Sequence, residues 1–253
     1  MSALTFAALV FMSIFLAALA GVQMQRVLPE KFTDDATEGD VKAVLGMLSM
    51  MTAVVLGFVT ANAKNSFDHA SKIVADTAVR MVSIDRTLAD FGDQGEAIRG
   101  RLKKGADEWI ARIKSPAGDA NSDLRAVQRA EELETFVASI QKLEPASEAQ
   151  AEAQGRAVEQ ALGILHDRWV LKTDREASTP TVFLLVLLAW LGLEFFIFGL
   201  FAARNAAIVF VTFFGAAMVA SAFFLVLDLE RPMTGPMRVG TGPLERAVAI
   251  MGQ

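Results

Sequence analysis

The sequence predicts an all-α membrane protein: four transmembrane helices, with a cytoplasmic helical bundle inserted between the second and the third. Three observations predict this fold. The 253-residue chain is 53% hydrophobic and yet 21% charged, a combination that ordinary soluble domains rarely show. Charged residues are nearly absent from four runs of roughly 20 residues each, the length at which a helix crosses a bilayer. No segment alternates convincingly with a period of two, so we expect no sheet.

The first apolar run, residues 3–22, predicts a transmembrane helix that is retained in the protein. Its sequence Ala18-Leu19-Ala20 resembles the small-residue cleavage site of a signal peptide. However, no Lys or Arg precedes the run, and a signal peptide would carry positive charge there. Residues 23–40 predict an acidic external loop in which Asp40 caps the next helix. We assign residues 1–63 to the first two membrane helices and this loop.

The second apolar segment begins a heptad stripe that continues beyond the membrane. Small or apolar residues recur at steps of three and four from Gly46 to Phe91, without proline, and Gly92 is the expected stop. A single helix over 41–91 would be roughly 75 Å long, so about half of it must project into water. The stripe positions within the membrane are candidates for lining a pore: Gly46, Ser49, Ala53, Leu56 and Thr60. Small residues at this spacing also let helices pack closely, and this alternative stays open.

Residues 64–179 predict a cytoplasmic helical region that continues helix 2 and adds three amphipathic helices. Their positive and negative charges are interspersed, as on the solvated backs of helices. Trp109 and Trp169 lie on the expected apolar faces, which predicts that both belong to the core. The three faces are Ile98, Leu102, Trp109 and Ile113; Leu133, Phe136, Val137, Ile140 and Leu143; and Val158, Leu162, Leu165 and Trp169.

Residues 180–227 predict a transmembrane hairpin of helices 3 and 4, followed by a cytoplasmic tail over 228–253. Glu194 is the only ionisable residue deep inside a membrane segment. Such an acid is costly in a bilayer, so we expect it to coordinate an ion, relay a proton, form a hydrogen bond with a neighbouring helix or reach water at the membrane boundary. Arg204 and Asn205 form the external tip of the hairpin, where Arg204 either attracts anions or caps the preceding helix.

The distribution of basic residues predicts the orientation in the membrane. Counting Lys and Arg near the membrane ends gives nine on the side of residues 64–179 and four on the other side. Positive charge is retained on the cytoplasmic side. We therefore expect a multi-pass protein of the inner (plasma) membrane, with both termini and residues 64–179 in the cytoplasm.

Composition also excludes several classes of function. The chain has no Cys and only two His, which argues against a metal site. The net charge of −5 disfavours nucleic acid as a partner. No phosphate-binding loop, nucleophile motif or pair of catalytic carboxylates is present, so we expect neither an enzyme nor a cofactor.

Four stretches of the chain resemble a bacterial membrane family that carries a bestrophin-like domain. They are LGFVTANAKNSFD at 56–68, IDRTLADFG at 84–92, FGLFAARN at 198–205 and LDLERPMTG at 227–235. With the four-helix layout they cover nearly the whole chain in order. The sequence departs from the family pattern at Ala203, where proline is expected, and at Met233, where phenylalanine is favoured.

This resemblance implies a distant relation to bestrophins, pentameric anion channels whose second membrane helix lines the pore. It implies a bestrophin-like fold, a homo-oligomer of five subunits in the lipid bilayer and inorganic ions as the transported species. Our first hypothesis is thus an oligomeric ion channel with helix 2 along the axis. The alternative is a non-conducting membrane scaffold or sensor, whose cytoplasmic helices bind a partner protein through their apolar stripe.

Overall fold

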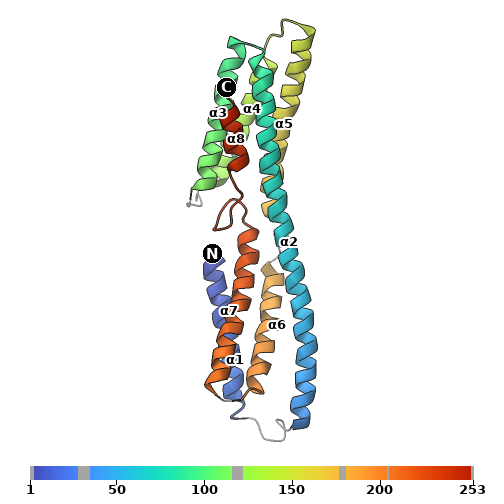
Figure 1. The fold of residues 1–253 in the computed structure, drawn as a ribbon, viewed down its shortest axis with the longest axis vertical. Helices are drawn as coiled ribbons and strands as arrows, with labels where there is room; N and C mark the ends of the chain where they lie inside the picture. The colour runs from blue at the N-terminus through green and yellow to red at the C-terminus, as the bar shows by residue number, and fades with distance from the viewer. Residues whose placement is uncertain (1–2, 28–34, 116–121, 177–180, 204, 252–253) are drawn as a thin grey trace. The chain divides into compact units, whose positions relative to one another are not determined.

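The described part of the chain is entirely helical. The computed structural model describes residues 3–27, 35–115, 122–176, 181–203 and 205–251, and no strand occurs among them. Figure 1 shows the eight helices of these residues. They are α1 (Ala3–Met24), α2 (Asp35–Ala89), α3 (Asp93–Lys114), α4 (Ser122–Gln141), α5 (Glu148–Glu176), α6 (Thr181–Leu200), α7 (Ala206–Leu229) and α8 (Gly242–Ile250).

Four of these helices are long and apolar enough to cross a membrane: α1, α2, α6 and α7. Each contains a window of 18 residues with high mean hydropathy and at most two charged residues. This agrees with the four membrane segments expected from the sequence. Within α2, the charged residues from Lys64 onward end the apolar window, because a charged side chain in the bilayer is costly.

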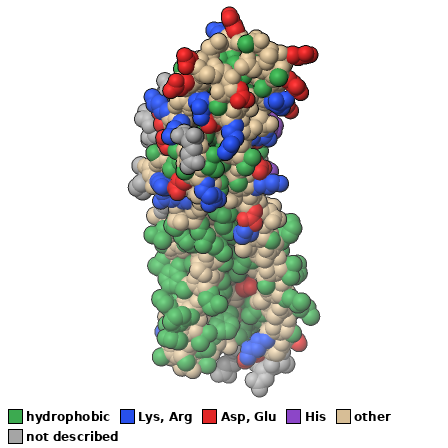
Figure 2. All heavy atoms as spheres, turned by 45° about the horizontal axis from the view of Figure 1, so that its top comes forward, with side chains coloured by type: hydrophobic (Ala, Val, Ile, Leu, Met, Phe, Trp, Pro, Cys, Tyr) green, Lys and Arg blue, Asp and Glu red, His purple; other side chains and the backbone are tan. Residues whose placement is uncertain are grey.

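The chain divides into two compact units. Unit 1 comprises Met1–Asn65 and Ala177–Glu230, and unit 2 comprises Ser66–Glu176 and Arg231–Gln253. Helix α2 contributes its first part to unit 1 and its second part to unit 2. Figure 2 shows mainly hydrophobic side chains on the surface of unit 1, whereas Lys, Arg, Asp and Glu gather on unit 2.

In unit 1, helix α1 packs against both α6 and α7. The contact with α6 is close because Gly21 and Gly199 face each other across it. A Cβ built on Gly21 would collide with the carbonyl oxygen of Phe196, and one on Gly199 would collide with that of Ala18. Small residues permit this backbone approach between membrane helices. The contact with α7 is aromatic: Phe213 lies edge-on to Phe11, with ring centroids 5.2 Å apart.

The core of unit 2 is built around the second part of α2. Its stripe residues from Ala70 to Phe91 are buried, among them Val74, Ile84 and Leu88 at 0% exposure. The faces predicted for α3 and α4 contribute Ile98, Leu102, Trp109, Ile113, Phe136, Val137, Ile140 and Leu143 to this core. The second half of the heptad stripe is therefore the interior of a helical bundle.

The turn between α2 and α3 depends on two glycines. Gly92 has a positive φ of 54°, a backbone conformation that residues other than glycine rarely adopt. A Cβ on Gly95 would collide with the carbonyl oxygen of Leu88. Next to this turn, Asp85 is buried and accepts two hydrogen bonds from Arg99, at 2.8 Å from Nε and 3.0 Å from Nη2. The stretch 84–92 therefore has a structural role here.

The tail folds back onto unit 2. Val239, Leu244, Ala247 and Met251 join the core, and α8 packs against α3. Arg238 donates from Nη1 to the carbonyl oxygens of Ile113 and Lys114, both at 3.0 Å, at the C-terminal end of α3. These carbonyl groups have no partner within their own helix, and a cation there is also favoured by the helix dipole.

Two details of the sequence analysis were wrong. Helix α2 begins at Asp35, so Asp40 lies inside the helix rather than at its cap. Acidic residues are favourable in a first turn, and Glu38 pairs with Lys42 one turn later. On α5 the buried residues are Ala153, Ala157, Ala161 and Ile164, whereas Leu162 and Trp169 are about half exposed. Alanines at four-residue spacing allow close helix packing, and Leu162 and Trp169 lie outside it.

Candidate functional site

Helix α2 presents three different faces within unit 1. At about 100° per residue, Thr52, Val59 and Ala63 fall on one side, and all three are buried. Large apolar side chains occupy the opposite side and are strongly exposed: Val44, Met47, Met50, Met51, Val54 and Phe58. The apolar window of α2 is only 11% buried, against 22–28% for the other three candidate spans. The single chain therefore leaves most of this membrane helix uncovered.

The predicted stripe lies between the buried face and the large apolar face. Gly46, Ser49 and Ala53 are exposed, and Leu56 and Thr60 are half-buried. A Cβ on Gly46 or on Gly57 would meet no atom within 4 Å. These small residues thus do not bring α2 close to another helix of the same chain, in contrast to Gly21 and Gly199.

Glu194 of α6 connects to this helix through two hydroxyl groups. Its Oε2 accepts a hydrogen bond from Ser49 Oγ at 3.1 Å, and its Oε1 accepts one from Thr52 Oγ1. Glu194 is 9% exposed and Thr52 is 4% exposed. Of the alternatives expected for this acid, the structure shows the hydrogen bond to a neighbouring helix. It joins the candidate pore helix to the hairpin.

The direction of these bonds determines what the stripe offers to an ion. Ser49 gives its proton to Glu194, and Thr60 gives its proton to the carbonyl oxygen of Leu56 at 2.8 Å. Each hydroxyl then has only oxygen lone pairs left for another partner. The polar atoms of the stripe consequently act as acceptors, which suits cations better than anions.

The tip of the hairpin is described in part. Arg204 lies outside the described residues. Asn205 is the N-cap of α7, and its Oδ1 accepts a hydrogen bond from the backbone N–H of Ile208 at 3.0 Å. This cap satisfies one of the unpaired N–H groups at a helix start. Asn205 therefore has a clear structural role at this end of the hairpin.

Within the described residues, no three His, Cys, Asp or Glu side chains are grouped so as to hold a metal ion. The side chains bonded to Glu194 are the neutral hydroxyl groups of Ser49 and Thr52. The chemistry that this site supports is the stabilisation of an ion or a helix contact by oxygen atoms.

Sequence reasoning identified Glu194 but missed Thr52 and the pair Gly21 and Gly199. Thr52 is three residues after Ser49, so the two hydroxyls share a face, and this spacing was an available signal. The glycine contact had no such signal, because each helix carries several small residues. Which of them meet depends on the rotation of α1 against α6.

Comparison with known proteins relates the whole chain to one family. A family model described as "Bestrophin-like domain" matches residues 5–244. A search of curated proteins finds no match.

Solved structures of a bacterial bestrophin homologue from Klebsiella pneumoniae share the fold. One single-substitution variant is 18% identical and matches with a TM-score of 0.71 over 100% of this chain and 99% of that chain. A second is 17% identical, with a TM-score of 0.68 over 97% of this chain and 99% of that one. A third is 18% identical, with a TM-score of 0.68 over 100% of both chains.

Proposed function

Because the chain belongs to the bestrophin-like family, we propose that it is an oligomeric ion channel in which α2 from several copies surrounds a central axis. The observation that carries this proposal is the exposure of α2. Its small face at Gly46, Ala53 and Gly57 and its large apolar face are both uncovered in the single chain. A ring of copies would bring the small faces toward the axis and leave the large side chains to neighbours and lipid.

The transported ions belong, in this proposal, to the class of cations. The hydroxyl oxygens of the exposed Ser49 and the half-buried Thr60 are acceptors because both protons are already donated. Glu194 lies directly behind Ser49 and adds carboxyl oxygens to the same region. A pore that selects anions would instead present N–H groups or basic side chains. A measured reversal potential in a KCl gradient should therefore approach that of K⁺, and one near that of Cl⁻ contradicts this assignment.

We also propose that residues 64–179 and both termini are cytoplasmic in the inner membrane, as the Lys and Arg counts favour. The assembly is a homo-oligomer, and a pentamer is the subunit number that the resemblance implies. Protease or reporter fusions at either terminus test the orientation directly.

The chain suits a cysteine-accessibility experiment because it contains no Cys. Ala53→Cys places a thiol on the proposed axis face, and Val54→Cys places one on the large apolar face. In planar bilayers, a charged methanethiosulfonate reagent should alter the current of Ala53→Cys and leave Val54→Cys and the parent chain unchanged. Equal effects of the reagent on both variants would mean that the pore axis does not lie beside Ala53. The absence of current from an assembled ring would favour the non-conducting scaffold.

The scaffold alternative relied on an apolar stripe that is open to a partner. From Ala70 to Phe91 this stripe is buried in the core of unit 2. A partner would have to displace α3, α4 and α5 to reach it. The observed burial therefore supports the channel over the scaffold.

A further inference from the structure

Unit 2 contains a pocket that the proposed ion path does not use. It has a volume of about 220 Å³ and lies between α2, α3, α4 and α5. Its floor is apolar and comprises Met81, Leu102, Leu133, Phe136 and Ile164. Its charged lining comprises Arg101, Lys104, Glu108, Arg112, Glu132 and Arg168, and Gly105 completes the wall.

The charge of this lining differs in sign from that of the whole protein. Four cations face two carboxylates in the pocket, whereas the chain carries a net charge of −5. Four of the six charged groups follow one face of α3, at steps of three and four residues, from Arg101 to Arg112. The surplus of positive charge is therefore concentrated along one wall of the pocket.

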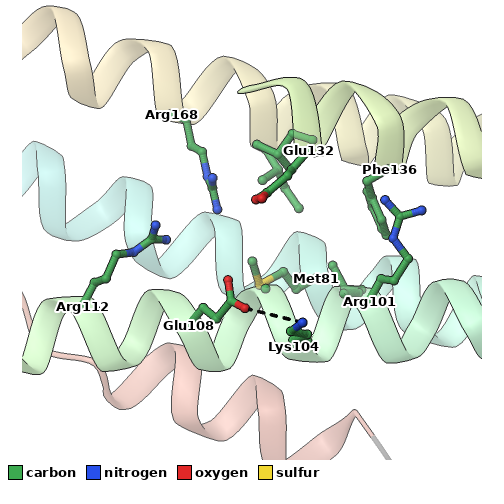
Figure 3. Close-up of a pocket in the computed structure, with 12 residues that line it drawn as sticks. Met81, Arg101, Lys104, Glu108, Arg112, Glu132, Phe136 and Arg168 are labelled. Atoms are coloured by element: carbon green, nitrogen blue, oxygen red, sulfur yellow. Dashed lines mark ion pairs between the residues drawn. The ribbon is translucent and has the colours of Figure 1, made fainter. Parts of the chain in front are cut away.

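Two of the four cations lie beside other side chains of unit 2. The guanidinium carbon of Arg168 lies 5.6 Å from the centre of the Trp109 ring, a cation–π arrangement. Lys104 lies 4.0 Å from Glu108. Figure 3 shows Arg112 and Arg168 extending from opposite walls toward the same part of the pocket. Both arginines have other interactions within the protein, but each guanidinium carries five N–H donors, so the two can share the recognition of a single anionic group.

We propose that this pocket binds a small organic anion, whose phosphate or carboxylate group lies between Arg112 and Arg168 and whose apolar body lies against Leu102, Phe136 and Ile164. A bare inorganic ion fits this pocket less well than an organic anion, because the apolar floor would then stay in contact with water. The volume is below the range of about 300–1,000 Å³ for drug-sized ligands, so the occupant is small. The site lies within unit 2 and does not depend on ion conduction.

Titration calorimetry on the purified full-length protein, with matched detergent in both solutions, tests the proposal with three probes. Phenyl phosphate carries both an apolar body and an anionic group, inorganic phosphate lacks the body, and benzyl alcohol lacks the charge. We expect saturable binding of phenyl phosphate that is about ten-fold tighter than that of either other probe. Equal binding of phenyl phosphate and inorganic phosphate would overturn the proposal.

Two glycines on α3 provide a matched pair of variants. Both Gly105 and Gly100 have open space at the Cβ position, but only Gly105 lines the pocket. Methionine at either position raises helix propensity, so neither variant should lose folded structure. Gly105→Met should abolish binding of phenyl phosphate and Gly100→Met should retain it. Loss in both variants, or in neither, would place the binding outside this pocket.

A second pair of variants tests the charge. Lys103 neighbours Lys104 on α3 and does not line the pocket. Arg112→Gln should weaken phenyl phosphate binding by about ten-fold, since a charge-assisted hydrogen bond is lost. Lys103→Gln should leave binding unchanged. A similar loss in both variants would indicate attraction by overall charge, which contradicts a specific site.

Discussion

At Thr52 a single hydroxyl group joins two membrane helices. Thr52 and Ser49 of α2 donate to the two oxygens of Glu194, and Thr52 and Glu194 are both buried. In lipid an acid without such donors would be costly, because no water replaces them. The three residues therefore form one polar unit, and its energetic coupling can be measured.

Thr52→Val should weaken the contact between α2 and α6. The lost hydrogen bond corresponds to about 0.5–1.5 kcal/mol, and the change should depend on the presence of Glu194. A double-mutant cycle with Glu194→Gln, measured by thermal unfolding in detergent, would show this coupling. Thr60→Val is the control, because the Thr60 hydroxyl bonds to Leu56 of its own helix. Coupling of Thr60 to Glu194 as strong as that of Thr52 would contradict the assignment.

Glu245 of α8 makes the docking of the tail sensitive to acid. The hydrogen bond from Lys114 Nζ, at 2.8 Å, and that from Thr241 lower the pKa of Glu245 below its ordinary value of 4.5. Its contribution is therefore present above pH 4.5 and is lost as the pH falls through the lowered pKa.

Hydrogen exchange of the α8 amides, compared between the wild type and Glu245→Gln at the same pH, measures this contribution. The variant should show weaker protection at pH 6, and the difference should shrink as the pH falls below 4.5 and Glu245 becomes protonated. The effect should be small and reduced by salt, because the pair is exposed to solvent. A difference that does not change with pH would show that the charge of Glu245 is not its cause.

Helices α1 and α6 have a close backbone contact, and glycine makes it feasible. Gly199 of α6 lies against the backbone of Ala18, whereas Gly192, two turns earlier in the same helix, has open space at its Cβ position. The two positions therefore differ in packing while sharing a helix and a residue type.

Gly199→Ala should destabilise unit 1, because the added Cβ would force α1 away from α6. Overpacking of this kind typically costs about 1–3 kcal/mol. Gly192→Ala should be neutral or stabilising, since alanine favours a helix. The melting temperatures of the two variants in detergent provide the comparison. A lower melting temperature for Gly192→Ala than for Gly199→Ala would refute the contact.

For the whole molecule, the expected state is a homo-oligomer whose contacts include α2. Large side chains such as Met50 and Phe58 are 73% and 74% exposed in the single chain. Membrane helices associate through close packing and polar contacts.

Native mass spectrometry should detect a single assembly, and the pentamer proposed above corresponds to five times the 27.3 kDa chain. Gly57→Trp on the small face should shift the distribution toward smaller species. The matched control is Leu4→Trp on α1, which replaces one exposed apolar side chain by another. A monomer for the parent chain would exclude the proposed pore.

Much of the element order follows from sequence pattern alone. The charge-free runs identify the four apolar helices, and the proline-free stripe indicates one helix from the membrane segment into the bundle, observed as Asp35–Ala89. The predicted face of α5 was wrong at Leu162 and Trp169, because the core there is made mainly of alanines, which hydropathy alone does not separate from surface alanines. Burial of Ala153, Ala157 and Ala161 depends on how closely α5 packs against its neighbours.

The sequence by itself determined the four apolar helices, the family and the need of Glu194 for a partner, because length, hydropathy and local charge are properties of contiguous residues. Only the tertiary structure decided that Thr52 and Ser49 are the partners, that Gly21 meets Gly199, and that cations of α3 and α5 line one pocket. Each of these depends on the rotation and offset of helices that are distant in sequence. The periodicity of one helix describes its faces, and packing between helices determines what each face meets.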